Sequence, residues 1–376
     1  MKPQKPAHRT LDRTLLFLVL VLVAGGFLIF SSASLGLLAR DGARFSSIAI
    51  SQFGFGVVGG LLALAVTSNI HYRIWRKYAF YFFVAALLLT LAVFIPHLGF
   101  AHGGARRWIA IGSFSFQPAE LLKFAFVVYT ATWLSGMQKY VGTTLKGTLP
   151  FVGLLGIVGI VMLLQPDTDT YVIMAAAAGA MFITAGGRWR DMLILFLAGV
   201  IMLGLLAFAR PYVMDRLLTF TDPGADPQGK GYQIQQSLIA IGSGGVAGRG
   251  FGQSIQKFEY LPEPIGDSIF AVFGEEFGFF GSATLILLFT FFAFRGYTVA
   301  SHSPDMFGTL LVIGFITLII TQAFLNIAAM LGVAPLSGLP LPFISHGGTA
   351  LLTTLAAVGI VLNVSKYAHP KRPKVV

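Results

Sequence analysis

Asp267 is the acidic side chain whose position in this sequence best suits it to chemistry. It closes a long polar stretch that approaches it through Lys257–Gly266, and the helix-like apolar run Ser268–Phe273 follows directly. A carboxylate at this point would lie at a membrane surface, beneath a loop large enough to form a cleft. The sequence therefore predicts a reactive site at Asp267 for a substrate that is delivered from the lipid.

Glu120 and Lys123 form a second polar group, and they fall inside an apolar stretch that begins at Gln117. Pro118 suits the first turn of a helix, and residues three apart share a helix face, so the two charges can pair. They would lie roughly 5 to 9 Å below the helix start, where ionisable side chains are costly and usually line a cavity. Two interpretations stay open: an ion pair that locks helices together, and a cavity in which Lys123 binds an anionic headgroup.

Two further carboxylate pairs also have more than one interpretation. On a continuous helix Glu275 would lie about 12 Å deeper than Asp267, and there Glu275 and Glu276 must be hydrogen-bonded, paired or protonated. We expect at least one of them to clasp another helix. Asp167 and Asp169 could bind a divalent cation, but ordinary turn chemistry explains this pair equally well.

The composition identifies the class of protein that positions these side chains. Hydrophobic residues make up 56% of the 376 residues, charged residues only 11%, and the mean hydropathy is +0.79. Soluble domains have about 25% charged residues. No polar stretch is long enough for a separate soluble domain, so residues 1–376 are predicted to form one integral membrane domain. The absence of cysteine excludes disulfides and thiolate metal sites.

Apolar stretches of about 18 or more residues recur along the chain, and each is a candidate membrane span. We therefore predict an all-α polytopic membrane protein with ten transmembrane helices. The predicted spans lie near Thr14–Leu37, Ile48–Thr67, Tyr78–Pro96, Gln117–Ser135, Thr148–Gln165, Thr170–Ala185, Asp191–Phe208, Ser268–Phe294, Phe307–Leu331 and His346–Lys366.

The basic residues predict the orientation of these spans. Ten spans place both termini and the short loops around Arg73, Arg188 and Arg295 on one side, and that side holds most of the lysines and arginines. The positive-inside rule then puts both termini in the cytoplasm. The net charge of +11 is mainly this topology signal. No basic patch interleaved with aromatic residues indicates a nucleic-acid partner.

The polar stretch 209–267, between the seventh and eighth spans, is predicted to be a large folded extracytoplasmic loop. It carries Arg210 and Arg216 and contains a predicted helix over Tyr232–Ile241. A glycine-rich run follows at 242–252. These glycines could form a backbone nest for phosphate, although such a run more often only permits tight turns. They match no nucleotide-binding fingerprint.

A series of motifs runs along nearly the whole chain. They are Arg107-Trp108, Gln117–Lys123, Gln165–Asp167, Gly231–Ser237, Ile239–Gly245, Tyr260–Glu263 ahead of Asp267, and Gly338–Gly348. In type and order these motifs resemble those of the bacterial SEDS proteins (shape, elongation, division and sporulation), the RodA/FtsW group, which also have ten spans. Ile265-Gly266 stand where the family usually has His-Thr, Ala119 where it has Ser, and His346 where it has Tyr.

The resemblance implies a peptidoglycan glycosyltransferase of the bacterial cytoplasmic (inner) membrane that polymerises lipid II for elongation or division. It implies a class B penicillin-binding protein, which crosslinks the glycan, as the partner. The family's essential aspartate corresponds to Asp267, and its cavity pair corresponds to Glu120 and Lys123. Lipid II would reach the site laterally from the membrane lipids, with its prenyl chain in a groove between spans.

The implied reaction joins a sugar hydroxyl to a sugar carbon that bears a polyprenyl diphosphate. It requires a general base, for which Asp267 is the candidate. It also requires positive charge on the departing diphosphate, from Lys123, Arg210, Arg216 or a divalent cation, Mg²⁺ or Mn²⁺, whose ligands the sequence does not identify. A single displacement would invert the anomeric centre.

Two other functions remain as alternatives. A flippase for the lipid-linked precursor would place its polar site near the bilayer midplane on repeated, broken helices, and only Glu275 and Glu276 favour it. A non-catalytic scaffold for a synthase partner is the third interpretation, and it predicts that Asp267→Asn leaves glycan synthesis unchanged.

Overall fold

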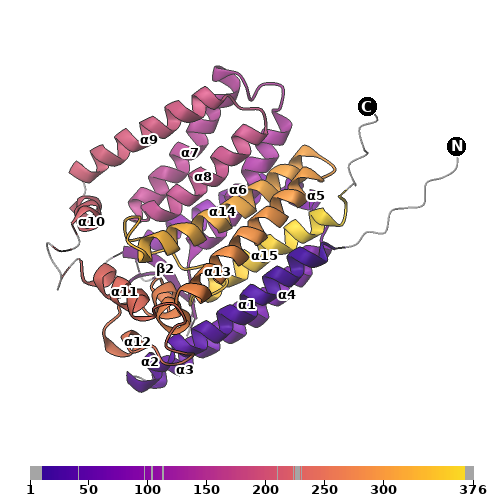
Figure 1. The fold of residues 1–376 in the computed structure, drawn as a ribbon. Coiled ribbons are helices and arrows are strands. Elements are labelled where there is room, and N and C mark those ends of the chain that lie inside the picture. The colour runs from indigo at the N-terminus through magenta and orange to yellow at the C-terminus, as the bar shows by residue number, and fades with distance from the viewer. Residues whose placement is uncertain are drawn as a thin grey trace, which may run out of the picture.

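The computed structural model describes residues 11–40, 42–96, 98–102, 105–111, 114–209, 211–222, 224, 229 and 231–368. Most of them are helical, and the long helices lie side by side in one bundle (Figure 1). The elements of the first half are α1 (Arg13–Ala33), α2 (Leu35–Arg40), α3 (Gly42–Ile50), the π-helical η1 (Ser51–Val58), α4 (Gly59–Asn69), α5 (Arg73–Leu91), the 3-10 turn η2 (Ala92–Phe94), β1 (Gly99–His102), β2 (Ala105–Ile111), β3 (Phe114–Phe116) and α6 (Pro118–Gly136).

Every regular element that the structure describes in the second half of the chain is a helix. They are the π-helical η3 (Thr144–Thr148), α7 (Leu149–Leu164), α8 (Thr168–Thr184), α9 (Trp189–Ala209), α10 (Pro211–Thr221), α11 (Tyr232–Ser243), α12 (Gln256–Glu259), α13 (Ile269–Ser301), α14 (Met306–Met330) and α15 (Gly348–Ser365). The predicted loop helix over Tyr232–Ile241 is confirmed as α11, which continues for two residues beyond that prediction.

Eight of the ten predicted spans correspond to helical stretches that are long and apolar enough to cross a membrane. These stretches are Arg13–Ala39, Phe45–Asn69, Arg73–Phe94, Thr144–Leu164, Trp189–Phe208, Ile269–Ser301, Met306–Met330 and Gly348–Ser365. The other two predicted spans are helices as well, α6 and α8. However, α8 has only 17 residues, and α6 carries an ion pair in its first two turns. The chain is therefore a multi-pass membrane protein, and the count of ten spans stays a prediction.

Local sequence explains where several helices begin. The Asp12 carboxylate caps α1 by accepting the backbone N–H of Leu15 at 2.9 Å, and Asp305 caps α14 through the N–H of Gly308 at 2.8 Å. Pro118 occupies the first turn of α6, where a missing N–H costs nothing. Short polar side chains at these positions satisfy donors that the helix itself leaves open.

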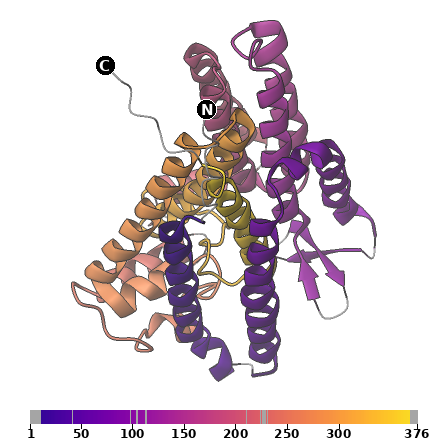
Figure 2. The same cartoon turned by 90° about the vertical axis from the view of Figure 1, so that its right-hand side faces the viewer.

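A three-stranded antiparallel sheet between α5 and α6 has no counterpart in the predicted all-helical architecture. The order is β1-β2-β3, and Ile109 in the central strand pairs with Gly99 on one side and Phe116 on the other. Figure 2 shows the strands beside the helix bundle. The segment is too short and too polar to register as a span, which is why hydropathy alone left it unassigned.

The core of the bundle forms around α14, which packs against α6, α8, α13 and α15. The Phe124 and Phe315 rings lie 5.1 Å apart across α6 and α14. A Cβ atom at Gly314 would come within 2.6 Å of the Met181 and Val127 side chains, so glycine lets three helices approach closely here.

The outermost helix is α9, and its side chains are apolar and largely exposed. Phe196 and Phe208 are 67% and 84% exposed. Such a surface is stable against lipid but not against water, and it supports the assignment of α9 as a membrane span.

Candidate active site

The bundle has two distinct ends. We call the end that carries α11, α12 and the segment 244–268 the loop end, and the end where α1 begins and α15 finishes the terminal end (Figure 1). Asp267 lies at the loop end, two residues before α13 begins. Gln233 on α11 donates from Nε2 to the Asp267 Oδ1 atom at 3.3 Å and to the Ser268 hydroxyl at 3.0 Å. One amide therefore orients the carboxylate and the start of the helix together.

The protonation of Asp267 is strongly shifted by its surroundings. Burial raises the pKa of this carboxyl to about 7, and the nearby charge of Glu263 raises it further, while the hydrogen bond from Gln233 lowers it. A carboxylate with a pKa near neutral pH accepts a proton more readily than an ordinary aspartate and is still about half ionised at pH 7. Asp267 therefore has the chemistry of a general base.

Glu120 and Lys123 form the ion pair that their spacing predicts. Lys123 Nζ lies 2.8 Å from Glu120 Oε1, and both side chains are buried. Two neighbours complete the group: Gln322 on α14 accepts from Lys123 Nζ at 2.9 Å, and the Thr353 hydroxyl on α15 donates to Glu120 Oε2 at 3.3 Å. The group thus joins three helices, α6, α14 and α15.

The cavity beside this pair is small. Its volume is about 20 Å³, and besides the ion pair it is lined by apolar side chains of α6 and α14, such as Phe124 and Phe315, and by Thr353, Thr354 and Ala357 of α15. A cavity of this size holds about one water molecule. In this conformation the pair is a buried structural element, and an anionic headgroup can reach Lys123 only after α6, α14 and α15 have moved apart.

Asp167 and Asp169 each face an arginine. Asp167 Oδ1 lies 3.8 Å from Arg107 Nη1, and burial raises the pKa of this carboxyl while the charge of Arg107 lowers it. Arg107 comes from β2 and also donates to the backbone carbonyl groups of Gln165 and Pro166. The main role of the pair is therefore to tie the sheet and α10 to the start of α8.

Of the two arginines predicted to bind substrate, the structure describes only Arg216. Arg216 Nη1 lies 2.7 Å from Asp169 Oδ2, with a third of the arginine side chain still exposed. Asp169 Oδ2 also accepts the backbone N–H of Gly338 at 3.2 Å. Arg210 lies outside the described residues.

Glu275 and Glu276 clasp the loop onto α13. Glu275 accepts the Ser254 hydroxyl at 2.6 Å and the backbone N–H groups of Ile255 and Gln256 at 3.1 and 3.2 Å. Glu276 Oε1 lies 2.7 Å from Lys257 Nζ, a side chain with no exposed surface. The expectation that at least one of the two carboxylates clasps another helix is confirmed for Glu276, which accepts the Ser32 hydroxyl of α1, while Glu275 holds the loop segment. The observation that favoured a transport pathway therefore loses its force.

Lys257 connects this clasp to α1. Its ammonium group also donates to the Ser32 hydroxyl at 3.0 Å and to the Gly252 carbonyl at 2.8 Å, and Ser32 donates to Glu276 Oε1 at 2.6 Å. The two buried charges are thus satisfied by each other, by the Ser32 hydroxyl and by the Gly252 carbonyl, as buried ions must be. This cluster fixes the loop end against α1 and α13.

The glycine-rich run packs against a kink in α13 at Gly278, where φ is +64°. At the kink the N–H groups of Phe279 and Phe280 turn away and donate to the carbonyls of Gly245 and Val246. In exchange, the Glu275 and Glu276 carbonyls accept the N–H groups of Arg249 and Gly250, at 3.0 and 2.9 Å. The N–H groups of Arg249 and Gly250 are thus already hydrogen-bonded and cannot bind a phosphate. The glycine-rich run packs onto the kinked helix as a structural element, which agrees with the tight-turn interpretation.

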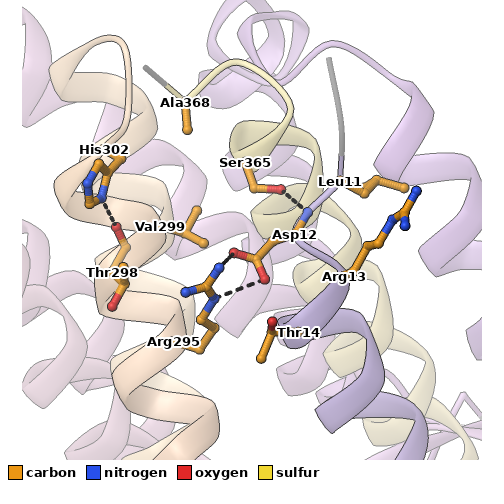
Figure 3. Close-up of a pocket in the computed structure, with 10 residues that line it drawn as sticks. All are labelled: Leu11, Asp12, Arg13, Thr14, Arg295, Thr298, Val299, His302, Ser365 and Ala368. Carbon is orange, nitrogen blue, oxygen red and sulfur yellow. Dashed lines mark hydrogen bonds and ion pairs between the residues drawn. The ribbon is translucent and has the colours of Figure 1, made fainter. Parts of the chain in front are cut away.

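A cavity of about 510 Å³ lies at the terminal end, away from Asp267 (Figure 3). Arg295 on α13 holds the Asp12 carboxylate with Nη2–Oδ2 and Nε–Oδ1 distances of 2.8 and 3.0 Å, and the Asp12 N–H donates to the Ser365 hydroxyl at 3.0 Å. None of the predicted site residues lines this cavity. Its polar contacts tie the ends of α1, α13 and α15 together.

Three side chains around the predicted residues were missed: Gln233, Gln322 and Thr353. Gln322 and Thr353 are polar residues in helices that hydropathy describes only as apolar spans, and Gln233 lies in a stretch that hydropathy describes only as a loop. Gln322 had a usable signal, because an amide buried in a membrane span needs a polar partner there. Gln233 lies inside the motif Gly231–Ser237, but its contact with Asp267 is made across 34 residues of chain.

The described residues offer no resident metal centre. No group of three or more histidine, aspartate or glutamate side chains converges among them in a way that could hold an ion. The predicted divalent cation therefore gains no ligand among these residues, and it stays a prediction.

Comparison with known proteins places the chain among relatives of similar length. Residues 12–370 match the family of cell cycle proteins that comprises FtsW, RodA and SpoVE. Stage V sporulation protein E of Bacillus subtilis is 38% identical over 310 residues, which cover 82% of this chain and 85% of that protein. The probable peptidoglycan glycosyltransferase FtsW of Saccharophagus degradans is 39% identical over 363 residues, covering 95% of this chain and 93% of that protein.

Solved structures agree with this placement. A chain from a peptidoglycan synthase complex, studied for its coordination of polymerization and crosslinking, superposes with a TM-score of 0.77 at 27% identity, covering 95% of this chain and 98% of that one. The rod shape determining protein RodA of Thermus thermophilus superposes with a TM-score of 0.69 at 27% identity, over 96% and 99% of the two chains. The chain described here is therefore a member of the SEDS family, the group of FtsW, RodA and SpoVE.

Proposed function

We propose that this protein is a peptidoglycan glycosyltransferase that polymerises lipid II into glycan strands. The observation that carries the proposal is the half-buried Asp267 carboxylate at the loop end, with a pKa of about 7 and an orienting hydrogen bond from Gln233. Relatives that carry the name peptidoglycan glycosyltransferase match nearly the whole chain. The membrane-spanning bundle suits a substrate with a prenyl chain, because its exposed apolar helices accept the lipid beside the site.

In the proposed reaction Asp267 is the catalytic residue. It removes the proton from the acceptor sugar hydroxyl as that oxygen bonds to the anomeric carbon of the donor. The bond from this carbon to the diphosphate oxygen breaks, and the diphosphate leaves with the electron pair. One displacement inverts the anomeric centre, so a product with retained configuration or a covalent glycosyl-enzyme would contradict this mechanism.

The negative charge of the diphosphate needs compensation while it leaves. Arg216 is our candidate at the loop end, because a third of its side chain is exposed and its ion pair with Asp169 is made through Nη1. Glu120 and Lys123 are proposed to join the substrate groove when the helices around them separate. We assign no protein ligand to Mg²⁺ or Mn²⁺ and propose that the cation enters as the counter-ion of the diphosphate.

The same proposal fixes the setting of the protein. The loop end faces the outside of the bacterial cytoplasmic membrane, and both termini are cytoplasmic, as the distribution of basic residues predicts. The partner is a class B penicillin-binding protein, which suits the similarity to a chain of a peptidoglycan synthase complex. Such a partner crosslinks the strands that this chain makes.

The test is glycan-chain formation from labelled lipid II by the purified protein with its cognate class B partner and a divalent cation. Wild type is expected to give polymer, and Asp267→Asn is expected to give none. Polymer from both proteins would remove Asp267 from the chemistry. If neither gives polymer although the partner is bound, the polymerase proposal fails, and lipid transport becomes the activity to measure.

A further inference from the structure

Three consecutive backbone carbonyls lead up to the Asp267 side chain, and each has one specific donor. The Ile265 carbonyl accepts the backbone N–H of His346 at 2.8 Å. The Gly266 carbonyl accepts the Ser345 hydroxyl at 2.7 Å. The Asp267 carbonyl accepts the Asn326 side-chain amide at 2.7 Å. We call these three donors the carbonyl clamp.

The donors come from two parts of the chain that lie far from Asp267 in sequence. Asn326 belongs to α14, and Ser345 and His346 lie near the end of the irregular segment 335–347, which is part of the connection from α14 to α15. The segment forms no regular helix, because prolines interrupt it and Phe343 has a φ of +67°. Its position therefore depends on hydrogen bonds to other elements, since backbone groups inside a membrane bundle need partners.

Two amides of α14 set that position. Asn326 Nδ2 donates not only to the Asp267 carbonyl but also to the Leu339 carbonyl, at 2.8 Å. One turn earlier, Gln322 Nε2 donates to the Pro340 carbonyl at 2.8 Å, while its Oε1 accepts from Lys123. Residues four apart share one helix face, so a single face of α14 holds the irregular segment, Asp267 and Lys123.

Ser345 completes the connection within the segment. Its hydroxyl accepts the N–H of Leu341 at 2.8 Å while donating to Gly266. Ser345 is 5% exposed and Asn326 has no exposed surface. Without these two donors the Gly266 and Asp267 carbonyls would lose the partners that fix their positions, and the backbone beside the Asp267 side chain would shift.

We propose that Asn326 and Ser345 are positioning residues that hold the Asp267 carboxylate in its reactive place through the carbonyl clamp. This inference rests on the proposed function, in which Asp267 is the base. Both side chains donate to backbone carbonyls and not to the Asp267 carboxylate, so their effect is on its geometry. A displacement of about 1 Å can cost roughly 100-fold in rate.

The chain offers a matched control for each residue at the terminal end. Asn363 is 1% exposed and also bridges two backbone groups, donating to the Ser68 carbonyl at 2.7 Å and accepting the Tyr72 N–H at 2.8 Å. Ser365 accepts the Asp12 N–H and donates to the Leu362 carbonyl, which repeats the bonding pattern of Ser345. Substitutions at these controls remove equivalent bonds far from Asp267.

The experiment compares Asn326→Leu with Asn363→Leu, and Ser345→Ala with Ser365→Ala and Ser345→Thr. Each purified protein is complexed with the class B partner, its folded fraction is measured by thermal melting, and lipid II polymerisation is followed per folded molecule. The clamp variants are expected to lose about 10- to 100-fold in kcat with KM nearly unchanged. The controls and Ser345→Thr, which keeps the hydroxyl, are expected to keep the kcat of wild type.

Two results would overturn the inference. One is a folded Asn326→Leu or Ser345→Ala protein whose kcat equals that of its control. The other is a control variant, Asn363→Leu or Ser365→Ala, that loses as much kcat as the clamp variant with which it is compared. If Asn326→Leu fails to fold, the Ser345 series decides alone. The proposed function fails in a different way: wild type makes no polymer, or Asp267→Asn remains active.

Discussion

The pKa of Asp267 can be shifted upward by removing one hydrogen bond. Gln233 lowers this pKa because its amide donates to the ionised carboxylate at 3.3 Å. Gln233→Met keeps the length and approximate volume of the side chain but removes the donor. A hydrogen bond to a charged group contributes about 1.5–3 kcal/mol, and a long one belongs at the lower end of that range. With about 1.4 kcal/mol per pKa unit, the pKa should rise by about one unit, to about 8.

The assay is kcat/KM for lipid II polymerisation between about pH 5.5 and 9.5, because this parameter reports the ionisation of the free enzyme. The base must be deprotonated, so wild-type activity should rise with pH through about 7. In the pH profile of kcat/KM, the acidic limb of Gln233→Met should lie about one pH unit higher than that of wild type. At pH 7 the ionised fraction would fall from about one half to about one tenth, a roughly five-fold loss, and the two proteins should converge at high pH.

Gln236→Met is the matched control, because Gln236 lies on the same helix and makes no hydrogen bond to Asp267 among the described residues. Its profile should coincide with wild type. A loss of kcat/KM by the same factor at every pH in Gln233→Met would contradict this prediction, because it would indicate a packing or binding defect. An acidic limb of Gln233→Met displaced to lower pH would contradict it equally.

Three further predictions concern charge, the buried clasp and the glycine run. Glu263→Gln removes the negative charge that raises the Asp267 pKa, so the same acidic limb should move to lower pH; an unmoved limb would contradict this. Lys257→Met leaves Glu276 as an unpaired buried charge and should cost about 3–5 kcal/mol of stability, measured by thermal melting, whereas replacing both residues with methionine should recover part of it. Gly248→Ala places a Cβ atom against the Glu276 carbonyl at a φ of +82° and should lower the melting temperature strongly, while Gly242→Ala, which meets no atom within 4 Å, should not.

The parts of the structure that sequence reasoning predicted are those that depend on neighbouring residues. The long apolar helices follow from hydropathy, and the pairing of Glu120 with Lys123 follows from a spacing of three on one helix. The helix over Tyr232–Ile241 follows from apolar positions at helical spacing. Each of these features is determined by residues that lie close together in the chain, so no tertiary information was needed.

The partners of Asp267 depend on contacts that sequence spacing does not encode. Asn326 lies 59 residues from Asp267, and Ser345 lies 79 residues from Gly266. The motif Gly338–Gly348 indicated that this segment matters, but not which carbonyls it meets. The sheet around Ile109 was missed for a different reason, because its strands are too short for a periodic pattern to identify.

The location of the polar contacts follows from one requirement of membrane proteins. Irregular backbone within a membrane bundle persists only when other groups satisfy its N–H and carbonyl groups. The kink at Gly278 meets this requirement by exchanging bonds with the glycine run, and the segment 335–347 meets it through Gln322 and Asn326. The side chains that satisfy the irregular segment also fix the backbone beside Asp267. Stability and the placement of the reactive carboxylate therefore depend on the same hydrogen bonds, and a substitution there should reduce both.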